Sequence, residues 1–152
     1  MHSIPAMSSF HRAASWFLRI ALAAAFLSAV ADRFGIWGAP GQPGVSWGAW
    51  QPFVNYTAVL LFYLPKPLIA ISAVAATVAE IVIPIWLLIG FRLWLAASCS
   101  AVLLLVFGIS MIIGLGVKSP LDYSVFTAAA ASILLAVTHF PARPKISNEP
   151  RS

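Results

Sequence analysis

The sequence predicts an all-α, polytopic membrane protein, an antiparallel bundle of four transmembrane helices. Its 152 residues are 61% hydrophobic and only 9% charged, whereas soluble domains carry about 25% charged residues. The mean hydropathy is +0.94. Four long apolar runs are separated by segments that contain Gly, Pro or charged residues. Runs of about 20 apolar residues are typical of helices that cross a hydrocarbon core about 30 Å thick.

The whole bundle is expected to be one domain, residues 1–140, followed by a polar cytoplasmic tail, residues 141–152. The expected spanning helices cover residues 14–36, 67–90, 93–116 and 121–140.

Residues 38–66 are expected to form a long external loop, because the opening motif GAPGQPG is incompatible with a helix. Within it, the apolar stretch 53–64 is too short to span a bilayer. Trp and Tyr surround this stretch, and these residues favour the depth at which an apolar ring meets water. The pattern predicts an interfacial or re-entrant helix.

The first apolar run has a second interpretation. Arg12 and Arg19, an apolar core and the triplet Ala29-Val30-Ala31 are typical of a cleaved secretory signal. The run continues beyond residue 31 as DRFGIW, which can complete a spanning helix. We expect a retained helix, with cleavage as the alternative. Its packing face is expected to be the small-residue face that includes Ala24 and Ser28.

Scattered Lys and Arg residues give the net charge of +5, without a basic block that would bind nucleic acid. Cytoplasmic ends of membrane helices are enriched in Lys and Arg. Arg12, Arg92 and the basic residues of the tail lie on one side of a four-helix bundle. On the other side, the positive charges of Arg33, Lys66 and Lys118 are partly offset by Asp32 and Asp122. This distribution predicts that both termini are cytoplasmic.

Glu80 is the only charged residue within the run 67–90 and lies near its middle. A carboxylate at that depth costs about 2.5–3.5 kcal/mol on insertion scales. Small residues, Thr77 and Pro84 share its helix face, so we expect it to face protein. Arg19 is the expected partner. Two interpretations stay open. Glu80 is a functional site, or a Glu80–Arg19 pair, or a protonated Glu80 bonded to Thr77 or a serine, only fixes helix packing.

A second polar cluster is expected where the outer ends of three helices converge. Lys118 and Asp122 are four residues apart and can pair, as can Arg33 and Asp122. The cluster is either a set of solvated ion pairs, the preferred interpretation, or a polar mouth to a pocket near Glu80. Its members are Asp32, Arg33, Lys118, Asp122 and Tyr123.

Sequence motifs for catalysis or cofactor binding are absent. The chain has no glycine-rich phosphate loop, HExxH or GxSxG. Its single cysteine, Cys99, excludes an intrachain disulfide and a CxxC redox pair. We therefore expect no resident cofactor or metal and no solitary enzyme.

Several short motifs occur in a distinctive order, beginning with Arg19 near the start of the first helix. The others are ADRFGIWG (31–38), VSWGAWQPF (45–53), ATVAE (76–80), LLIGFR (87–92), AA (96–97) and GVKSPLDYSVF (116–126). Together they resemble the DoxX family of small four-helix bacterial membrane proteins, over roughly residues 16–138.

The resemblance implies a location in the bacterial inner membrane, with the lipid bilayer and a redox-protein subunit or a second copy as partners. Some relatives are described as a small subunit of thiosulfate:quinone oxidoreductase, others as members of oxidative-stress or thiol redox complexes. No settled catalytic residues transfer; only Arg19 and Glu80 match charged membrane positions of the family.

Three functional hypotheses follow. The first is a non-catalytic accessory subunit or a binder of a lipophilic ligand, a quinone or a lipid. The second is the membrane subunit of a quinone-linked oxidoreductase, in which Glu80 relays a proton. The third is a small proton-coupled transporter, disfavoured because the chain has no internal repeat.

Overall fold

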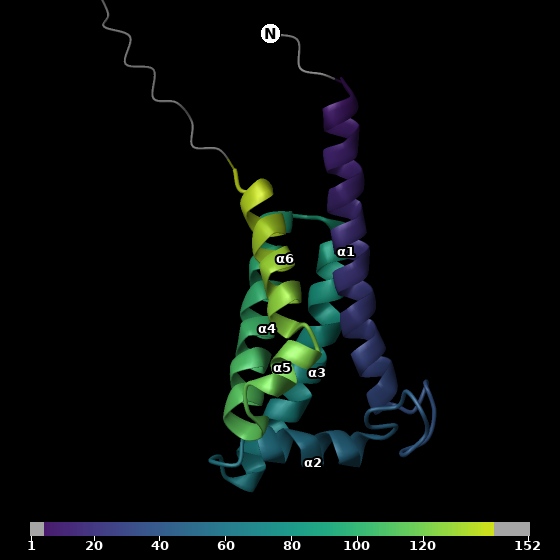
Figure 1. Cartoon of the computed structure of the whole chain (residues 1–152), viewed down its shortest axis with the longest axis vertical. Coiled ribbons are helices and arrows are strands. Elements are labelled where there is room, and N and C mark those ends of the chain that lie inside the picture. The colour runs from purple at the N-terminus through teal and green to yellow at the C-terminus, as the bar shows by residue number, and fades with distance from the viewer. Residues whose placement is uncertain (1–4, 142–152) are drawn as a thin grey trace, which may run out of the picture.

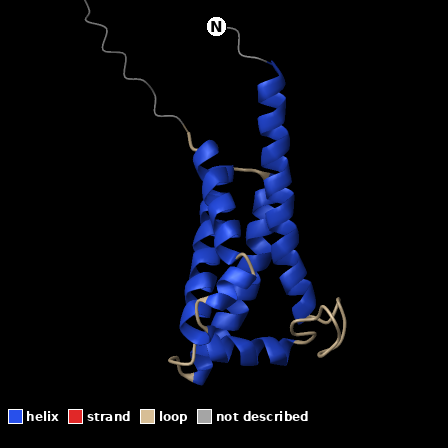
Figure 2. Ribbon diagram, viewed as in Figure 1, coloured by secondary structure: helices blue, strands red, loops and turns tan. Residues whose placement is uncertain are grey.

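Every regular element in the described part of the chain is a helix. The computed structural model describes residues 5–141, with side chains from Ser9 onward, and this range contains no strand (Figure 2). Most of the expected tail, residues 142–152, lies outside it. The helices are α1 (Pro5–Arg33), α2 (Trp50–Leu60), α3 (Lys66–Ile89), α4 (Leu93–Leu115), α5 (Lys118–Asp122) and α6 (Val125–Thr138).

The long helices α1, α3, α4 and α6 run side by side, and α2 lies across one end of them (Figure 1). The start of α1, the end of α6 and the turn between α3 and α4 all lie at the opposite end. The first turns of α1 extend beyond the other helices. α2 and the loop before it therefore cover one end of the bundle only.

Within the described part of the chain, three helices are long and apolar enough to cross a membrane: Ser9–Arg33, Lys66–Ile89 and Leu93–Leu115. This agrees with a membrane protein. The fourth apolar helix, α6, has only 14 residues, which is about 21 Å at ~1.5 Å per residue. A fourth crossing, made by α5 and α6 together, stays a prediction.

The expected fourth helix, residues 121–140, is divided in two. α5 ends at Asp122, and Ser124 adopts a left-handed conformation with φ 54° before α6 begins. Asp122 therefore ends a short helix instead of lying in the first turn of a long one. An L-residue in this conformation interrupts the helical path, and sequence periodicity carries no signal for it.

The first helix begins nine residues earlier than expected and ends at Arg33 instead of residue 36. Gly35, with φ 72°, allows the chain to leave the helical path there. The expected packing face is also wrong: Ala24 and Ser28 are exposed, whereas Leu22 and Phe26 are buried. The buried face of α1 instead contains Leu22, Ala23, Phe26 and Val30.

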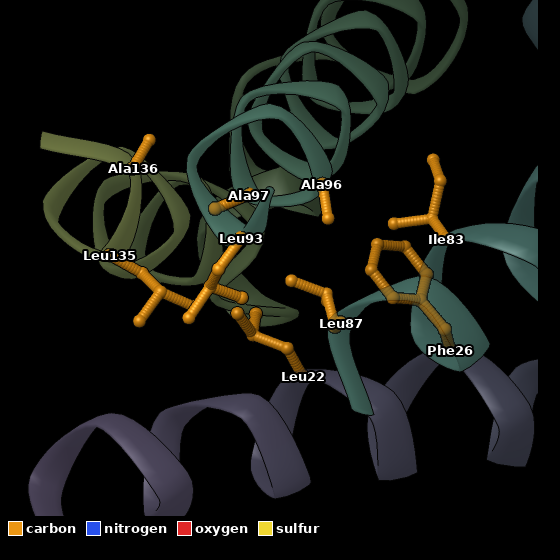
Figure 3. Close-up of a cluster of buried hydrophobic side chains, with 9 residues drawn as sticks. All are labelled: Leu22, Phe26, Ile83, Leu87, Leu93, Ala96, Ala97, Leu135 and Ala136. Carbon is orange, nitrogen blue, oxygen red and sulfur yellow. The ribbon is translucent and has the colours of Figure 1, made fainter. Parts of the chain in front are cut away.

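The apolar core joins four helices (Figure 3). Leu22 and Phe26 of α1 lie beside Ile83 and Leu87 of α3, and all four belong to one buried cluster. Dense contacts of this kind hold interiors together through many weak attractions. The remaining core residues are Leu93, Ala96 and Ala97 of α4 and Leu135 and Ala136 of α6.

Small residues bring α4 close to its neighbours. A Cβ added to Gly114 would lie 2.7 Å from the Cα of Leu60, so α2 crosses α4 where only glycine fits. Farther along α4, the hydroxyls of Ser100 and Ser132 form a hydrogen bond of 2.9 Å, and both residues are fully buried. Membrane helices commonly associate in this way.

Candidate functional site

The carboxylate of Glu80 is paired with the guanidinium of Arg33, the last residue of α1. Arg33 Nη1 forms an ion pair with Glu80 Oε2 and donates a hydrogen bond of 2.8 Å to Thr77 Oγ1. The Thr77 hydroxyl itself donates to the carbonyl of Ala73 at 2.9 Å, which leaves its lone pairs free to accept. Arg33 is 2% exposed and Glu80 3%. The structure therefore contains a buried charged pair between α1 and α3.

Arg19 does not pair with Glu80, so that expectation is wrong. Its Nε and Nη2 donate to the carbonyls of Leu87 and Leu88, at 2.7 and 2.6 Å, in the last turn of α3. These acceptors lie roughly 10 Å along α3 from Glu80, at ~1.5 Å per residue. Helical side chains tilt toward the N-terminus of their helix, so Arg33 reaches back into the bundle.

The role of Arg19 is to satisfy the end of α3. The last carbonyls of a helix have no intrahelical partner, and a cation there complements the helix dipole. Gly90 ends α3 with φ 78°, and a Cβ added to it would lie 2.6 Å from Arg19 Nη2. The guanidinium carbon also lies 3.7 Å from the ring centroid of Trp16. Arg19 is thus part of the packing between α1 and α3.

Aromatic rings from the loop and from α2 cover the ion pair. The guanidinium carbon of Arg33 lies 3.8 Å from the ring centroid of Phe53 and 5.3 Å from that of Trp47. The two rings meet edge to face, with centroids 5.2 Å apart. Such contacts are favourable for a cation. They also keep water away from the charges.

Asp32 attaches this cover to the end of α1. One carboxylate oxygen, Oδ2, accepts the backbone N–H groups of Ser46 and Trp47 at 3.0 and 2.9 Å. Asp32 is 5% exposed. Hydrogen bonds to an ionised acceptor are among the stronger ones in proteins. Asp32 therefore sets the position of Trp47, whose ring lies beside Arg33.

Three buried polar atoms in this region have no hydrogen-bond partner among the described residues. One is Glu80 Oε2, which Arg33 Nη1 contacts in the ion pair; the others are Asp32 Oδ1, an acceptor, and Arg33 Nε, a donor. Most buried polar groups in folded proteins are satisfied. We call Asp32, Arg33, Thr77 and Glu80, with the rings of Trp47 and Phe53, the Arg33 site.

The expected outer cluster does not form as one unit. Lys118 and Asp122 form the expected ion pair, but on the surface of α5. Tyr123 is 70% exposed. Burial of the Tyr56 phenol raises its pKa, and the charge of Tyr123 raises it further. Arg33 pairs with Glu80 and not with Asp122. Of the expected members, only Asp32 and Arg33 belong to the buried site.

Trp47 and Phe53 are the residues of the site that sequence reasoning did not include. Their aromatic character indicated an interfacial position, and nothing in their spacing indicated contact with a buried arginine. The available signal was the pair Asp32-Arg33 directly before a Trp-rich loop. A charged pair that ends a spanning helix needs partners, and the next segment is the nearest source.

Two apolar grooves lie beside α4, away from the Arg33 site. One, of about 390 Å³, is lined by Ile83 and residues of α4 such as Cys99 and Val102, and the other lies between α4 and α6. Neither lining includes Arg33 or Glu80. Among the described residues, no group of three or more His, Cys, Asp or Glu side chains is placed to hold a metal ion.

Comparison of the chain with known protein families, with curated proteins and with solved structures found no match. The functional conclusion therefore depends on the geometry of the site.

Proposed function

We propose that the chain is a non-catalytic, DoxX-like protein of the bacterial inner membrane that binds a lipophilic ligand, a quinone or a lipid, at the Arg33 site. Both termini are cytoplasmic, and α2 lies at the outer interface. The protein serves as an accessory subunit of a redox or stress-response complex. The observation that carries the proposal is the buried Arg33–Glu80 pair, with a free donor on Arg33 beneath an aromatic cover.

The depth of the pair supports this proposal. Glu80 lies about 21 Å from the start of α3 and about 14 Å from its end, at ~1.5 Å per residue. Two charges at such a depth are costly, and a buried ion pair is often no more stabilising than apolar residues of the same volume. Ionisable groups inside a membrane are therefore functional candidates by default.

The chemistry of the site suits a flat head group. The Arg33 guanidinium is flanked by the rings of Phe53 and Trp47, and its Nε can donate to a ligand oxygen. A ring-shaped head group can stack on either aromatic residue. The rings of Trp47 and Phe53 lie on Arg33, so the ligand reaches it by displacement of the cover formed by the loop and α2.

Purification in a mild detergent, organic extraction and mass spectrometry test the proposal. The wild-type protein is expected to retain a quinone or lipid in near-stoichiometric amount. Glu80→Gln and Arg33→Gln should lose it, because each removes half of the charged pair. Arg92→Gln changes an exposed arginine at the opposite end of the bundle and should retain it.

Equal helical content of all the variants in far-ultraviolet circular dichroism establishes that loss of the ligand is not loss of the fold. If the wild type retains no lipophilic molecule, or if the Glu80 and Arg33 variants retain the same amount, the binding proposal is wrong.

A further inference from the structure

Positive charge gathers at the end of the bundle opposite α2. Figure 1 shows that the start of α1 and the turn between α3 and α4 both lie there. Arg12 and Arg19 are seven residues apart, so they lie on one face of α1, and Arg92 belongs to the turn. None of the three forms an ion pair with a described residue.

The carboxylates of the described range are bound elsewhere, in the Arg33 site and on α5. Residues 142–152, outside that range, contain three basic side chains and one acidic side chain. Their composition therefore offers no net compensating charge. The positive charge at this end of the bundle is available to an anion from outside the chain.

Gly90 brings Arg92 close to Arg19. A Cβ added to Gly90 would lie 2.6 Å from Arg19 Nη2 and 3.4 Å from Nη1. Arg92 follows two residues later, so its Cα lies within about 8 Å of that of Gly90. Arg19 uses Nε and Nη2 to bind the carbonyls of α3, whereas its Nη1 has no acceptor among the described residues. Two like charges in one region repel, and an anion that binds both offsets the repulsion.

The apolar groove between α4 and α6 reaches the same end. Trp94, two residues after Arg92, meets Phe140 edge to face, with ring centroids 5.0 Å apart. The groove has a volume of about 590 Å³, and its lining includes Ser98, Val102 and Leu105 of α4 and Ile133, Val137 and Phe140 of α6. From Trp94 to Leu105, α4 rises about 16 Å at ~1.5 Å per residue. The groove is therefore long, narrow and apolar, with arginines beyond one end.

We propose that an acidic phospholipid binds here, with one acyl chain in the groove between α4 and α6 and its phosphate at Arg92 and Arg19. The guanidinium group presents a planar fork of donors that suits phosphate. Basic groups between membrane helices are a recurring site for acidic head groups.

The aromatic residues at this end support a lipid over an acidic protein. Trp16 contacts the Arg19 guanidinium, and Trp94 contacts Phe140. Tryptophan is enriched at the depth of lipid head groups, which places the arginines at the level of the phosphates. An acidic protein would match the charge but would leave the groove unfilled. This site is at the opposite end from the Arg33 site, so the inference goes beyond the proposed function.

Native mass spectrometry of the full chain in a neutral detergent tests the proposal. Protein stripped of lipid is titrated with phosphatidylglycerol or with phosphatidylethanolamine of the same acyl chains, so that only the head group differs. The wild type should bind the acidic lipid at least about fivefold more tightly, the contribution of one arginine near a membrane surface.

Matched variants test the two halves of the site. Arg92→Gln should lower the affinity for phosphatidylglycerol about fivefold. Lys118→Gln also removes one exposed positive charge, at the other end of the bundle, and should leave the affinity unchanged. Val102→Trp fills the groove and should weaken the binding of both lipids. Val78→Trp changes a similarly exposed valine of α3 outside the groove and should not.

Soluble anions distinguish the source of the phosphate. Glycerol 3-phosphate and hexaglutamate carry negative charge without acyl chains, so neither should displace the lipid at equal concentration. Displacement by glycerol 3-phosphate would replace the lipid with a free phosphate ester, and displacement by hexaglutamate would replace it with an acidic protein segment. Either result would overturn the proposal.

Three other results would also overturn it. Equal affinity of the wild type for both lipids would exclude an acidic head group as the specific ligand. A loss in Lys118→Gln as large as that in Arg92→Gln would reduce the effect to net charge. Equal binding by Val102→Trp and Val78→Trp would exclude the groove. Arg92 is exposed, so its replacement leaves the core intact, and Arg92→Gln should keep the ligand of the Arg33 site while it loses this phospholipid.

Discussion

Replacement of Glu80 by methionine should leave the guanidinium of Arg33 buried without a counter-charge. In the structure Arg33 is 2% exposed and Glu80 3%, so neither charge can turn to water without moving the cover. The remaining neutral partner, the Thr77 hydroxyl at 2.8 Å, cannot neutralise the cation. Removal of one member of such a pair destabilises a protein by about 3–5 kcal/mol.

Replacement of both charges should cost much less than the sum of the single changes. A methionine at each position fills a similar volume and removes two groups that must be desolvated. We expect Arg33→Met and Glu80→Met each to lower the free energy of unfolding by about 3–5 kcal/mol. The double variant should come within about 1 kcal/mol of the wild type, a coupling of several kcal/mol.

Unfolding with sodium dodecyl sulfate in mixed micelles, followed by far-ultraviolet circular dichroism, measures these differences. Lys118→Met is the matched control, because Lys118 belongs to an exposed ion pair and should cost no more than about 0.5 kcal/mol. If the Glu80 variant costs as little as this control, the pair is hydrated. If the double variant costs the sum of the singles, the two charges do not interact. Either result would refute the reasoning.

Three further predictions concern packing. Gly90→Ala should destabilise the protein by more than 1 kcal/mol, because the added Cβ would lie 2.6 Å from the Arg19 side chain. Arg19→Ala should partly rescue this loss, and a double-mutant cycle of unfolding free energies measures the rescue. Gly114→Ala should cost about 1–3 kcal/mol through overpacking of α2 against α4, with greater protease sensitivity of the loop. Ser100→Ala and Ser132→Ala should each cost about 0.6 kcal/mol, and the double variant little more, because one hydrogen bond is lost in all three; unchanged stability of all three would contradict this.

The helix content and the membrane character could be predicted from the sequence because both are local properties. The expected helices 67–90 and 93–116 agree with α3 and α4 to within a residue or two, since Gly90 and Gly116 end them in conformations that favour glycine. The break between α5 and α6 has no such residue. The left-handed Ser124 depends on how the two segments pack, and periodicity could not predict it.

The site was predicted in part. Glu80 is conspicuous as a lone carboxylate in an apolar run, and Thr77 shares its face because the two are three residues apart. The prediction that Arg19 pairs with Glu80 was wrong because the sequence does not give the relative depth of α1 and α3. Arg19 and Arg33 are both arginines of the first helix, but only the packed structure places Arg33 beside Glu80 and Arg19 at the last turn of α3.

The sequence by itself determined that this protein is helical, apolar and in need of a partner for Glu80, because length, composition and the energy cost of a buried charge follow from the residues alone. The tertiary structure decided which arginine meets that charge, which face of α1 is buried, and that Trp47 and Phe53 cover the pair. These features depend on contacts between residues far apart in the chain, such as the ion pair between Arg33 and Glu80. Only the packed helices bring them together.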